Sequence, residues 1–258
     1  MLAHQFCCVD IYKKEIYTMK KLLLALLAVA GISVAQAQVS GNLGLTSDYR
    51  LRGISQSQNA PAVQGGIDYN HSSGFYVGNW NSSVSSQMYT NGAGIESDVY
   101  AGWKKDIYKG LTLDVGSYNY FYPRATTAGT GSNFDTYEGF VGLGYGPVSA
   151  KYSRTLGHSY FGTANAQGTQ YYQADVNYPI PGSKISLLAH AGHTNVANST
   201  TLDYTDYNFG LGYNLAGFDL AAKYYTNTSL TSADKTADTI NGQKLYKNAA
   251  VLSVSKAF

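Results

Sequence analysis

The chain ends with Val251-Leu252-Ser253-Val254-Ser255-Lys256-Ala257-Phe258, in which apolar and polar residues largely alternate up to a terminal aromatic residue. A period of two is typical of a β-strand whose two faces meet different surroundings. Outer-membrane barrels commonly end in this way, because their last strand pairs with the first and leaves no free edge. We therefore expect a terminal strand over residues 246–258, with Phe258 at the point of barrel closure.

The segment that follows the N-terminal region alternates in the same way. Odd positions from Val39 to Leu51 are mostly apolar, and even positions from Ser40 to Arg52 are mostly polar. A helix would mix these residues around its circumference and present no clean apolar stripe. We expect a strand over residues 39–52 that pairs with the terminal strand.

Ten further segments lie between these two, each about ten residues long, which is the length that a tilted strand needs to cross a bilayer. We expect these strands near residues 62–70, 75–84, 95–104, 111–121, 134–145, 148–155, 169–178, 184–193, 204–214 and 218–226.

The connections between the segments alternate in length. Short turns at 71–74, 146–147, 179–183 and 215–217 are separated by longer connections rich in Ser, Thr, Asn, Gly and Ala. Tight turns on one side of the membrane and long loops on the other are typical of bacterial barrels. The sequence therefore predicts an all-β, antiparallel up-and-down transmembrane barrel of about twelve strands over residues 38–258.

The N-terminal region has the three parts of a secretory signal peptide. A basic start at Met19 precedes an apolar run, and Ala35-Gln36-Ala37 provides a cleavage site. The apolar run is shorter than the about 20 residues of a membrane-spanning helix. We expect residues 19–37 to be a cleaved signal peptide and residues 1–18 to be an upstream start extension. We expect the chain to be exported through this signal and to lie in the bacterial outer membrane as a multi-pass barrel.

Charge and cysteine content narrow the classes of function. Residues 1–37 hold four Lys and two acidic residues, so residues 38–258 keep 14 of the 18 Lys and Arg and 14 of the 16 Asp and Glu. A formal charge of zero gives no electrostatic reason to expect nucleic-acid binding. Both cysteines, Cys7 and Cys8, also lie in residues 1–37. Cysteine zinc sites and disulfide frameworks are thus excluded from the mature chain.

Charged residues recur at the positions that we expect to face the barrel interior. They are candidates to line a pore, or to form a paired network that fills a narrow lumen, since both occur in barrels. Their mixed signs give no preference for cations or anions. The candidates are Asp48, Arg50, Arg52, Asp68, Glu96, Asp98, Asp114, Glu138, Lys151, Asp175, Asp206 and Lys223.

Tyrosine is abundant, with 24 residues in the chain. Tyr118, Tyr120 and Tyr122 alternate along one expected strand. We expect them to belong to an interfacial girdle, because amphipathic rings prefer the level of the lipid headgroups. A track inside the lumen on which sugars stack is the alternative.

Histidines give no clear sign of catalysis or metal binding. His158 and Ser159 are adjacent in a loop without an evident orienting partner, and His190 and His193 must point to opposite faces of their strand. We expect no catalytic residue, no metal and no cofactor. A hydrolase triad assembled from distant positions stays open as an alternative.

Several stretches make the chain resemble the TorF porin family, a proteobacterial family long regarded as conserved proteins of unknown function. They are Gly41-Asn42-Leu43-Gly44-Leu45-Thr46-Ser47-Asp48-Tyr49-Arg50-Leu51-Arg52-Gly53, Pro61-Ala62-Val63-Gln64-Gly65-Gly66-Ile67-Asp68-Tyr69 and Ser73-Gly74-Phe75-Tyr76-Val77-Gly78-Asn79-Trp80. Weaker matches continue to residues 204–207. The resemblance implies an outer-membrane barrel without an established substrate or a set of catalytic residues.

We therefore expect a porin that passes small solutes passively or with weak selectivity. A barrel enzyme acting on outer-membrane lipid, or a structural or receptor barrel that binds a partner through its long loops, is the alternative. Expected partners are small solutes, the barrel-assembly machinery, outer-membrane lipid and lipopolysaccharide. Arg154 and Lys256 fall on the expected lipid face near its two rims, where cationic side chains can reach headgroups or phosphates.

Overall fold

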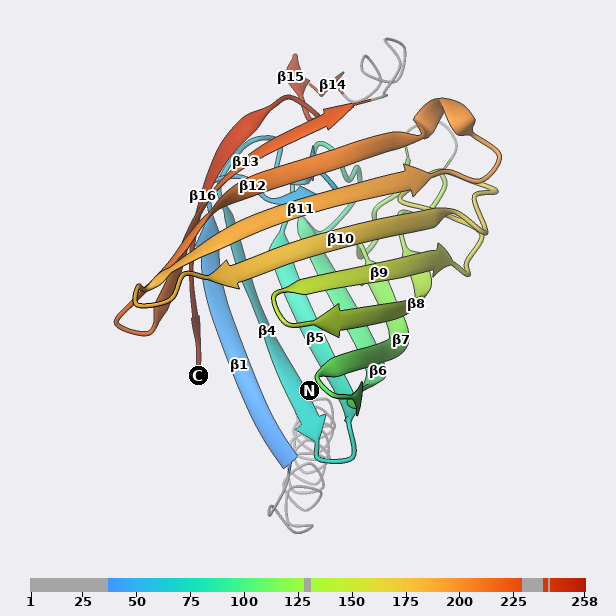
Figure 1. The fold of residues 1–258 in the computed structure, drawn as a ribbon. Coiled ribbons are helices and arrows are strands. Elements are labelled where there is room, and N and C mark those ends of the chain that lie inside the picture. The colour runs from blue at the N-terminus through green and yellow to red at the C-terminus, as the bar shows by residue number, and fades with distance from the viewer. Residues whose placement is uncertain (1–36, 128–130, 229–238, 241) are drawn as a thin grey trace, which may run out of the picture. The chain divides into compact units, whose positions relative to one another are not determined.

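The computed structural model describes residues 37–127, 131–228, 239–240 and 242–258. Within these ranges twelve long strands form a closed barrel, in which each strand pairs antiparallel with its neighbours along the chain (Figure 1). The all-β up-and-down barrel of twelve strands is thus confirmed. The barrel strands are β1 (Ala37–Thr46), β4 (Ala62–His71), β5 (Phe75–Ser83), β6 (Ile95–Tyr108), β7 (Leu111–Phe121), β8 (Thr136–Tyr145), β9 (Val148–Thr155), β10 (Gln170–Pro179), β11 (Ile185–Asn195), β12 (Tyr204–Leu215), β13 (Phe218–Thr228) and β16 (Ala249–Ala257).

Five short elements lie in the connections. They are β2 (Arg50–Leu51), β3 (Ile54–Ser55), the 3-10 turn η1 (Thr200–Leu202), β14 (Thr239–Ile240) and β15 (Gln243–Lys244). Among the described residues, the structure has no helix with the length and apolar character needed to cross a membrane. The predicted extension over 1–18 and all of the predicted signal peptide except its last residue lie outside the described residues.

The two faces of the barrel wall differ sharply in polarity. Leu43 on β1, Phe209 on β12 and Leu252 on β16 are 60%, 59% and 63% exposed on the outer face. Ser82 on β5 and Glu96 on β6 have the opposite parity and are 1% and 0% exposed inside the barrel. Because strand side chains alternate between the two faces, the period of two in the sequence produces an apolar exterior and a polar interior.

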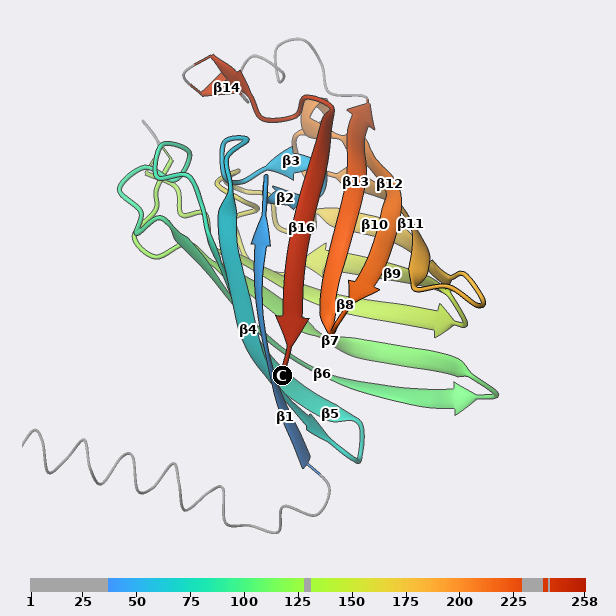
Figure 2. The same cartoon turned by 90° about the vertical axis from the view of Figure 1, so that its left-hand side faces the viewer.

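The first and last strands close the barrel. β1 pairs with β16 from Asn42–Ala257 to Thr46–Ser253. Gly41 and Phe258 then exchange two backbone hydrogen bonds of 2.8 and 2.9 Å. Figure 2 shows the C-terminus beside β1. A Cβ at Gly41 would lie 2.6 Å from the Phe258 ring, so glycine leaves room for the terminal aromatic side chain.

Short turns join the strands at the end of the barrel where the chain terminates. Lys109–Gly110 and Ala216–Gly217 have positive φ at both residues. This conformation matches the twist of a two-residue hairpin. At the opposite end the connections are longer, and they include residues 84–94, 122–135 and 156–169.

The first strand is shorter than we predicted. β1 ends at Thr46 instead of residue 52, and residues 47–61, which we call the lumenal segment, turn into the barrel (Figure 2). The segment supplies its own polar contacts in place of strand pairing. Asp48 accepts hydrogen bonds from Ser55 Oγ at 2.6 Å and from Arg50 Nε at 2.7 Å. These contacts satisfy buried polar groups that have left the sheet.

Candidate functional site in the barrel lumen

The lumenal segment is anchored to the wall on β5 and β6 through Tyr49. Its hydroxyl donates a hydrogen bond of 2.7 Å to Glu96, and its ring meets Trp80 edge-on with centroids 5.4 Å apart. Glu96 is fully buried and also accepts a hydrogen bond of 2.9 Å from Tyr122. Burial, and then the Glu96 carboxylate, hold the pKa of Tyr49 above its usual range, so the phenol keeps the proton that it donates.

Arg52 anchors the same segment to a second part of the wall, on β8 and β10. Its Nη2 lies 2.7 Å from Glu138 Oε2 on β8, and the two side chains are only 6% and 3% exposed. Its Nη1 donates to the Tyr160 hydroxyl at 3.0 Å, and its guanidinium lies 4.1 Å from the centre of the Tyr171 ring on β10. Removing one member of a buried ion pair leaves the other charge buried without compensation, which strongly destabilises the folded arrangement around it. The contact with the Tyr171 ring adds a cation–π attraction.

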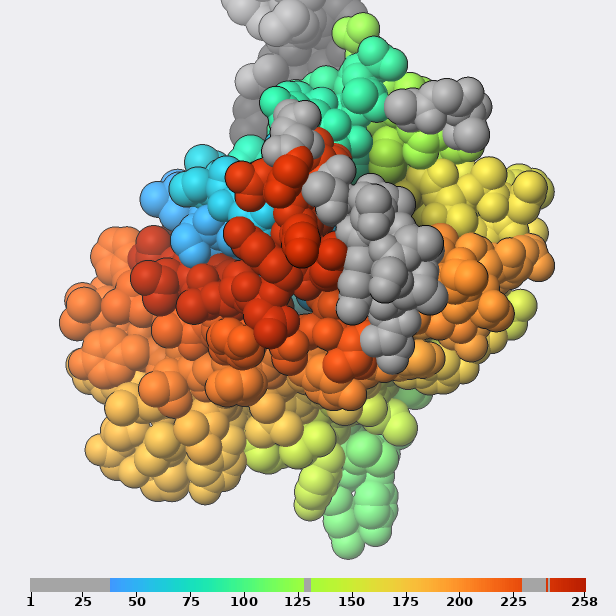
Figure 3. Space-filling view, turned by 90° about the horizontal axis from the view of Figure 1, so that it is seen from above, coloured from blue at the N-terminus to red at the C-terminus, as the bar shows by residue number. Residues whose placement is uncertain are grey.

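Arg50 joins the segment to the chain that leads into β16. Its Nη1 donates to Lys247 O at 2.7 Å, and Ser55 N donates to Leu245 O at 2.9 Å. Figure 3 shows this end of the barrel, where the red residues that precede β16 lie beside the blue-to-cyan residues of the segment. The segment is therefore fixed on three sides of the lumen.

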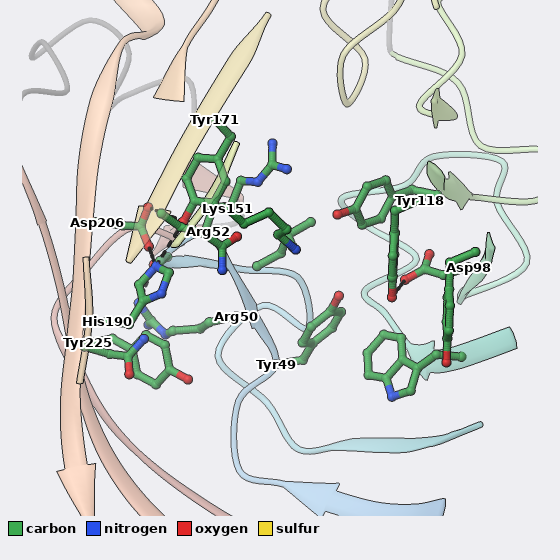
Figure 4. A pocket seen from close by; sticks show the side chains of 17 residues that line it. Tyr49, Arg50, Arg52, Asp98, Tyr118, Lys151, Tyr171, His190, Asp206 and Tyr225 are labelled. Carbon is green, nitrogen blue, oxygen red and sulfur yellow. Dashed lines mark hydrogen bonds and ion pairs between the residues drawn. The ribbon is translucent and has the colours of Figure 1, made fainter. Parts of the chain in front are cut away.

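Three cavities follow one another along the lumen. The inner cavity, of about 520 Å³, lies by the short turns and is lined by Asp114 and Asp175. The central cavity, of about 430 Å³, shares Lys151 with the inner one and is drawn in Figure 4. The outer cavity, of about 300 Å³, lies among the long loops. Leu51 and Arg52 line both the central and the outer cavities, so the lumenal segment separates them.

Three tyrosines of β6 and β7 face the lumen. Tyr100 and Tyr118 stack with centroids 4.9 Å apart and planes 5° apart, and Tyr118 contacts Tyr120 at 4.8 Å. Tyr118 and Tyr120 line the central cavity, and Tyr122 is 1% exposed. The prediction that these tyrosines form an interfacial girdle is wrong, because their parity on the strand places them inside.

His190 on β11 bridges two strands on the polar side of the lumen. Its Nδ1 lies 2.6 Å from Asp175 Oδ1, and its Nε2 lies 3.0 Å from Asp206 Oδ1. Tyr171 donates to the other oxygen of Asp206 at 3.0 Å. His193 lies on the outer face and contacts Thr205, as the parity argument predicted.

The predicted pore-lining residues occupy different places in this arrangement. The central cavity is lined by Arg50, Arg52, Asp98, Lys151 and Asp206, and the inner cavity by Asp114, Lys151 and Asp175. Glu96 and Glu138 are buried under the lumenal segment, and Asp48 lies within it. Asp68 accepts a hydrogen bond of 2.6 Å from Tyr100. Lys223 lies on β13, in register with Val251 and Gly210.

Sequence reasoning did not select several residues that the structure brings to the lumen. Trp80, Tyr100, Gln173, His190 and Asn208 line the central cavity. The alternation of side chains along a strand could have identified them, because each lies on the same face of the sheet as a predicted interior residue of its own strand or of a paired strand. Within the parts of the chain that the structure describes, there is no group of three or more His, Cys, Asp or Glu residues arranged to hold a metal ion.

Comparisons with known proteins agree with this architecture. A family model described as a bacterial protein of unknown function (Gcw_chp) matches residues 32–258. The KdgM porin in complex with disordered oligogalacturonate is 8% identical with a TM-score of 0.50, over 86% of this chain and 99% of that one. The NanC porin is 11% identical with a TM-score of 0.51, over 85% and 98%. A search of curated proteins found no match.

Proposed function

This chain belongs to the Gcw_chp family of bacterial proteins of unknown function, and we propose that it is an outer-membrane channel for small polar solutes that the lumenal segment closes. The observation that carries the proposal is the line of three cavities along the barrel, interrupted where Leu51 and Arg52 cross the lumen. Pores need a hydrated, polar interior of this kind, with charged side chains that set local fields.

The outer face of the barrel supports insertion into a membrane. Exposed leucine, valine, phenylalanine and tyrosine side chains cover it from β1 to β16. A closed barrel satisfies every strand hydrogen bond without water, which hydrocarbon requires. The likeness in fold to the KdgM and NanC porins supports an outer-membrane address. Export through residues 19–37 and membership of the TorF porin family are the finer parts of the same proposal.

Membrane contacts follow from two cationic side chains. Lys256 Nζ lies 4.9 Å from the centre of the Phe218 ring near the short-turn end. Arg154 is exposed at the opposite end of β9. Placed at the two rims, they would bind lipid headgroups and lipopolysaccharide phosphate, respectively. The terminal Phe258 would be the element that the barrel-assembly machinery engages when the last strand is closed against the first.

Conduction requires the lumenal segment to move or to leave the lumen. Release of Tyr49 from Glu96 and of Arg52 from Glu138 would join the central and outer cavities. The path would then pass the predicted pore-lining residues of both signs, so we expect weak selectivity between small cations and anions.

A catalytic role is not favoured. Both ring nitrogens of His190 contact carboxylates, and the third contact is with the Tyr171 hydroxyl. A triad instead needs one nitrogen directed at a nucleophilic hydroxyl, usually of serine. The arrangement around His190 therefore resembles a structural network across β10, β11 and β12.

Single-channel recording tests the proposal. Purified protein is inserted into planar bilayers, and conductance and reversal potentials are measured under a gradient of KCl. We expect discrete openings with long closed periods and a small reversal potential. The absence of conductance steps at every voltage, from protein whose mobility on gels shifts with heating as a folded barrel's does, would refute it.

A further inference from the structure

The central cavity has two unlike walls (Figure 4). One wall comes from β5, β6 and β7 and carries Trp80 and the stacked pair Tyr100 and Tyr118. Figure 4 shows Tyr118 and Asp98 on this side of the cavity. The facing wall comes from β9 to β13 and carries polar side chains, among them Lys151 and Asn208, together with Tyr171 and Tyr225. The volume of the central cavity, about 430 Å³, falls in the range of about 300–1,000 Å³ that is typical of small-molecule sites.

Most charged side chains that line the central cavity are paired with another charged side chain of the protein. Arg50 is paired with Asp48 at 2.7 Å, and Arg52 with Glu138 at 2.7 Å. Asp206 holds His190 at 3.0 Å. Among the described residues that line the cavity, this leaves Lys151 and Asp98, one charge of each sign, outside any ion pair, so the net charge offered to a ligand is close to zero.

The polar side chains of the cavity that still have free hydrogen-bonding groups offer both donors and acceptors. The side chains of Asn208 and Lys151 form no hydrogen bond or ion pair with any residue that the structure describes, although Lys151 Nζ lies 5.4 Å from the centre of the Phe140 ring. Gln173 Nε2 donates a hydrogen bond of 2.7 Å to Asp175, and the side-chain carbonyl oxygen of Gln173 stays available as an acceptor. An amide offers donors and acceptors together, and an ammonium offers donors alone. The polar wall therefore suits a ligand that both donates and accepts.

We infer that the central cavity binds a carbohydrate, with a sugar ring against the aromatic wall and hydroxyl groups on Asn208, Gln173 and Lys151. A sugar has C–H faces that pack on aromatic rings and hydroxyls that donate and accept at its edge. Lys151 would attract an organic anion and Asp98 would repel it, and the reverse holds for an organic cation, so the cavity favours neither sign of charge over a neutral ligand. The inference rests on the proposed channel function for the solute's route, but the binding step can be measured without conduction.

The chain provides a fluorescent reporter for this test. It has two tryptophans, Trp80 in the cavity wall and Trp103. Trp103 donates to Ser73 O at 3.0 Å in an exposed contact at the short-turn end. In the full-length protein carrying Trp103→Phe, Trp80 alone reports. Titration in detergent with glucose, galactose, maltose and cellobiose is expected to give a saturable change with at least one sugar.

Matched asparagine variants locate the site. Asn208→Ala is expected to weaken binding about threefold to tenfold, as loss of one or two neutral hydrogen bonds would. Asn119→Ala is the control, because Asn119 donates to Val99 O on the outer face. Equal weakening by both variants would overturn the assignment of the site.

The outcomes separate this inference from the channel proposal. A barrel that conducts KCl but binds none of the four sugars overturns the inference alone. A barrel that binds a sugar through Asn208 but never conducts overturns the channel and leaves the site. Saturable binding of tetramethylammonium or citrate, with no sugar binding, would show that the ligand class is wrong.

Discussion

Replacing Arg52 with glutamine removes the charge that holds the lumenal segment against β8. Its partner Glu138 is 3% exposed and would be left buried without its cation. Removing one member of a buried pair costs about 3–5 kcal/mol, largely because the remaining charge is desolvated. Once the segment leaves, water reaches Glu138, so this cost falls on the closed state. The ratio of closed to open channels should therefore drop by roughly 100-fold to 3,000-fold.

Single-channel recording of Arg52→Gln measures this ratio directly. Glu138→Gln should shift it in the same direction, and the double variant should add little, because both changes break the same pair. Lys184→Gln is the control, since Lys184 is exposed in a short turn. Gel mobility with and without heating shows whether each variant is folded. A folded Arg52→Gln barrel with the open probability of the unaltered protein would show that this ion pair does not hold the segment in the lumen.

Three further predictions concern the same contacts and the closure of the barrel. Tyr49→Phe removes the 2.7 Å hydrogen bond to Glu96 but keeps the ring, so openings should become about tenfold more frequent in bilayer recordings; unchanged gating would argue against this contact as an anchor. Gly53 has φ of +78°, and a Cβ added there would lie 2.8 Å from Asp206 Cβ. Gly53→Ala should therefore strain the closed state and also favour the open one. A variant that stays closed as the parent does would contradict it. Deleting Phe258 removes two backbone hydrogen bonds at the seam, and we expect a smaller folded fraction after refolding in detergent, measured by gel mobility; an unchanged fraction would show that the terminal residue does not matter there.

Much of the barrel could be predicted because its determinants are local. Parity along a strand decides which side chains face out, and a shift of one residue would expose every interior group. The exposed Leu43 and Leu252 and the buried Glu96 and Asp98 follow from this rule. The tyrosines followed it as well. Tyr118 shares the parity of Asp114 and opposes that of the exposed Val115, so the period already indicated the lumen.

The lumenal segment could not be predicted from local pattern. Residues 47–52 continue the alternation of β1, and nothing in that alternation marks Thr46 as the end of the strand. The chain turns inward because Tyr49 and Arg52 bind Glu96 and Glu138 in the lumen. These pairs are 47 and 86 residues apart in the sequence. Contacts of this range appear only when the barrel is closed.

If residues 47–61 close a channel, removing the tip of this lumenal segment must open it. A variant in which residues 50–57 are replaced by a short Gly-Ser linker keeps every barrel strand. Its single-channel conductance and open probability are compared with those of the unaltered protein in planar bilayers. We expect a pore that is open almost continuously and conducts more per opening. A folded deletion variant that opens as rarely, and conducts as little, as the unaltered protein would contradict it.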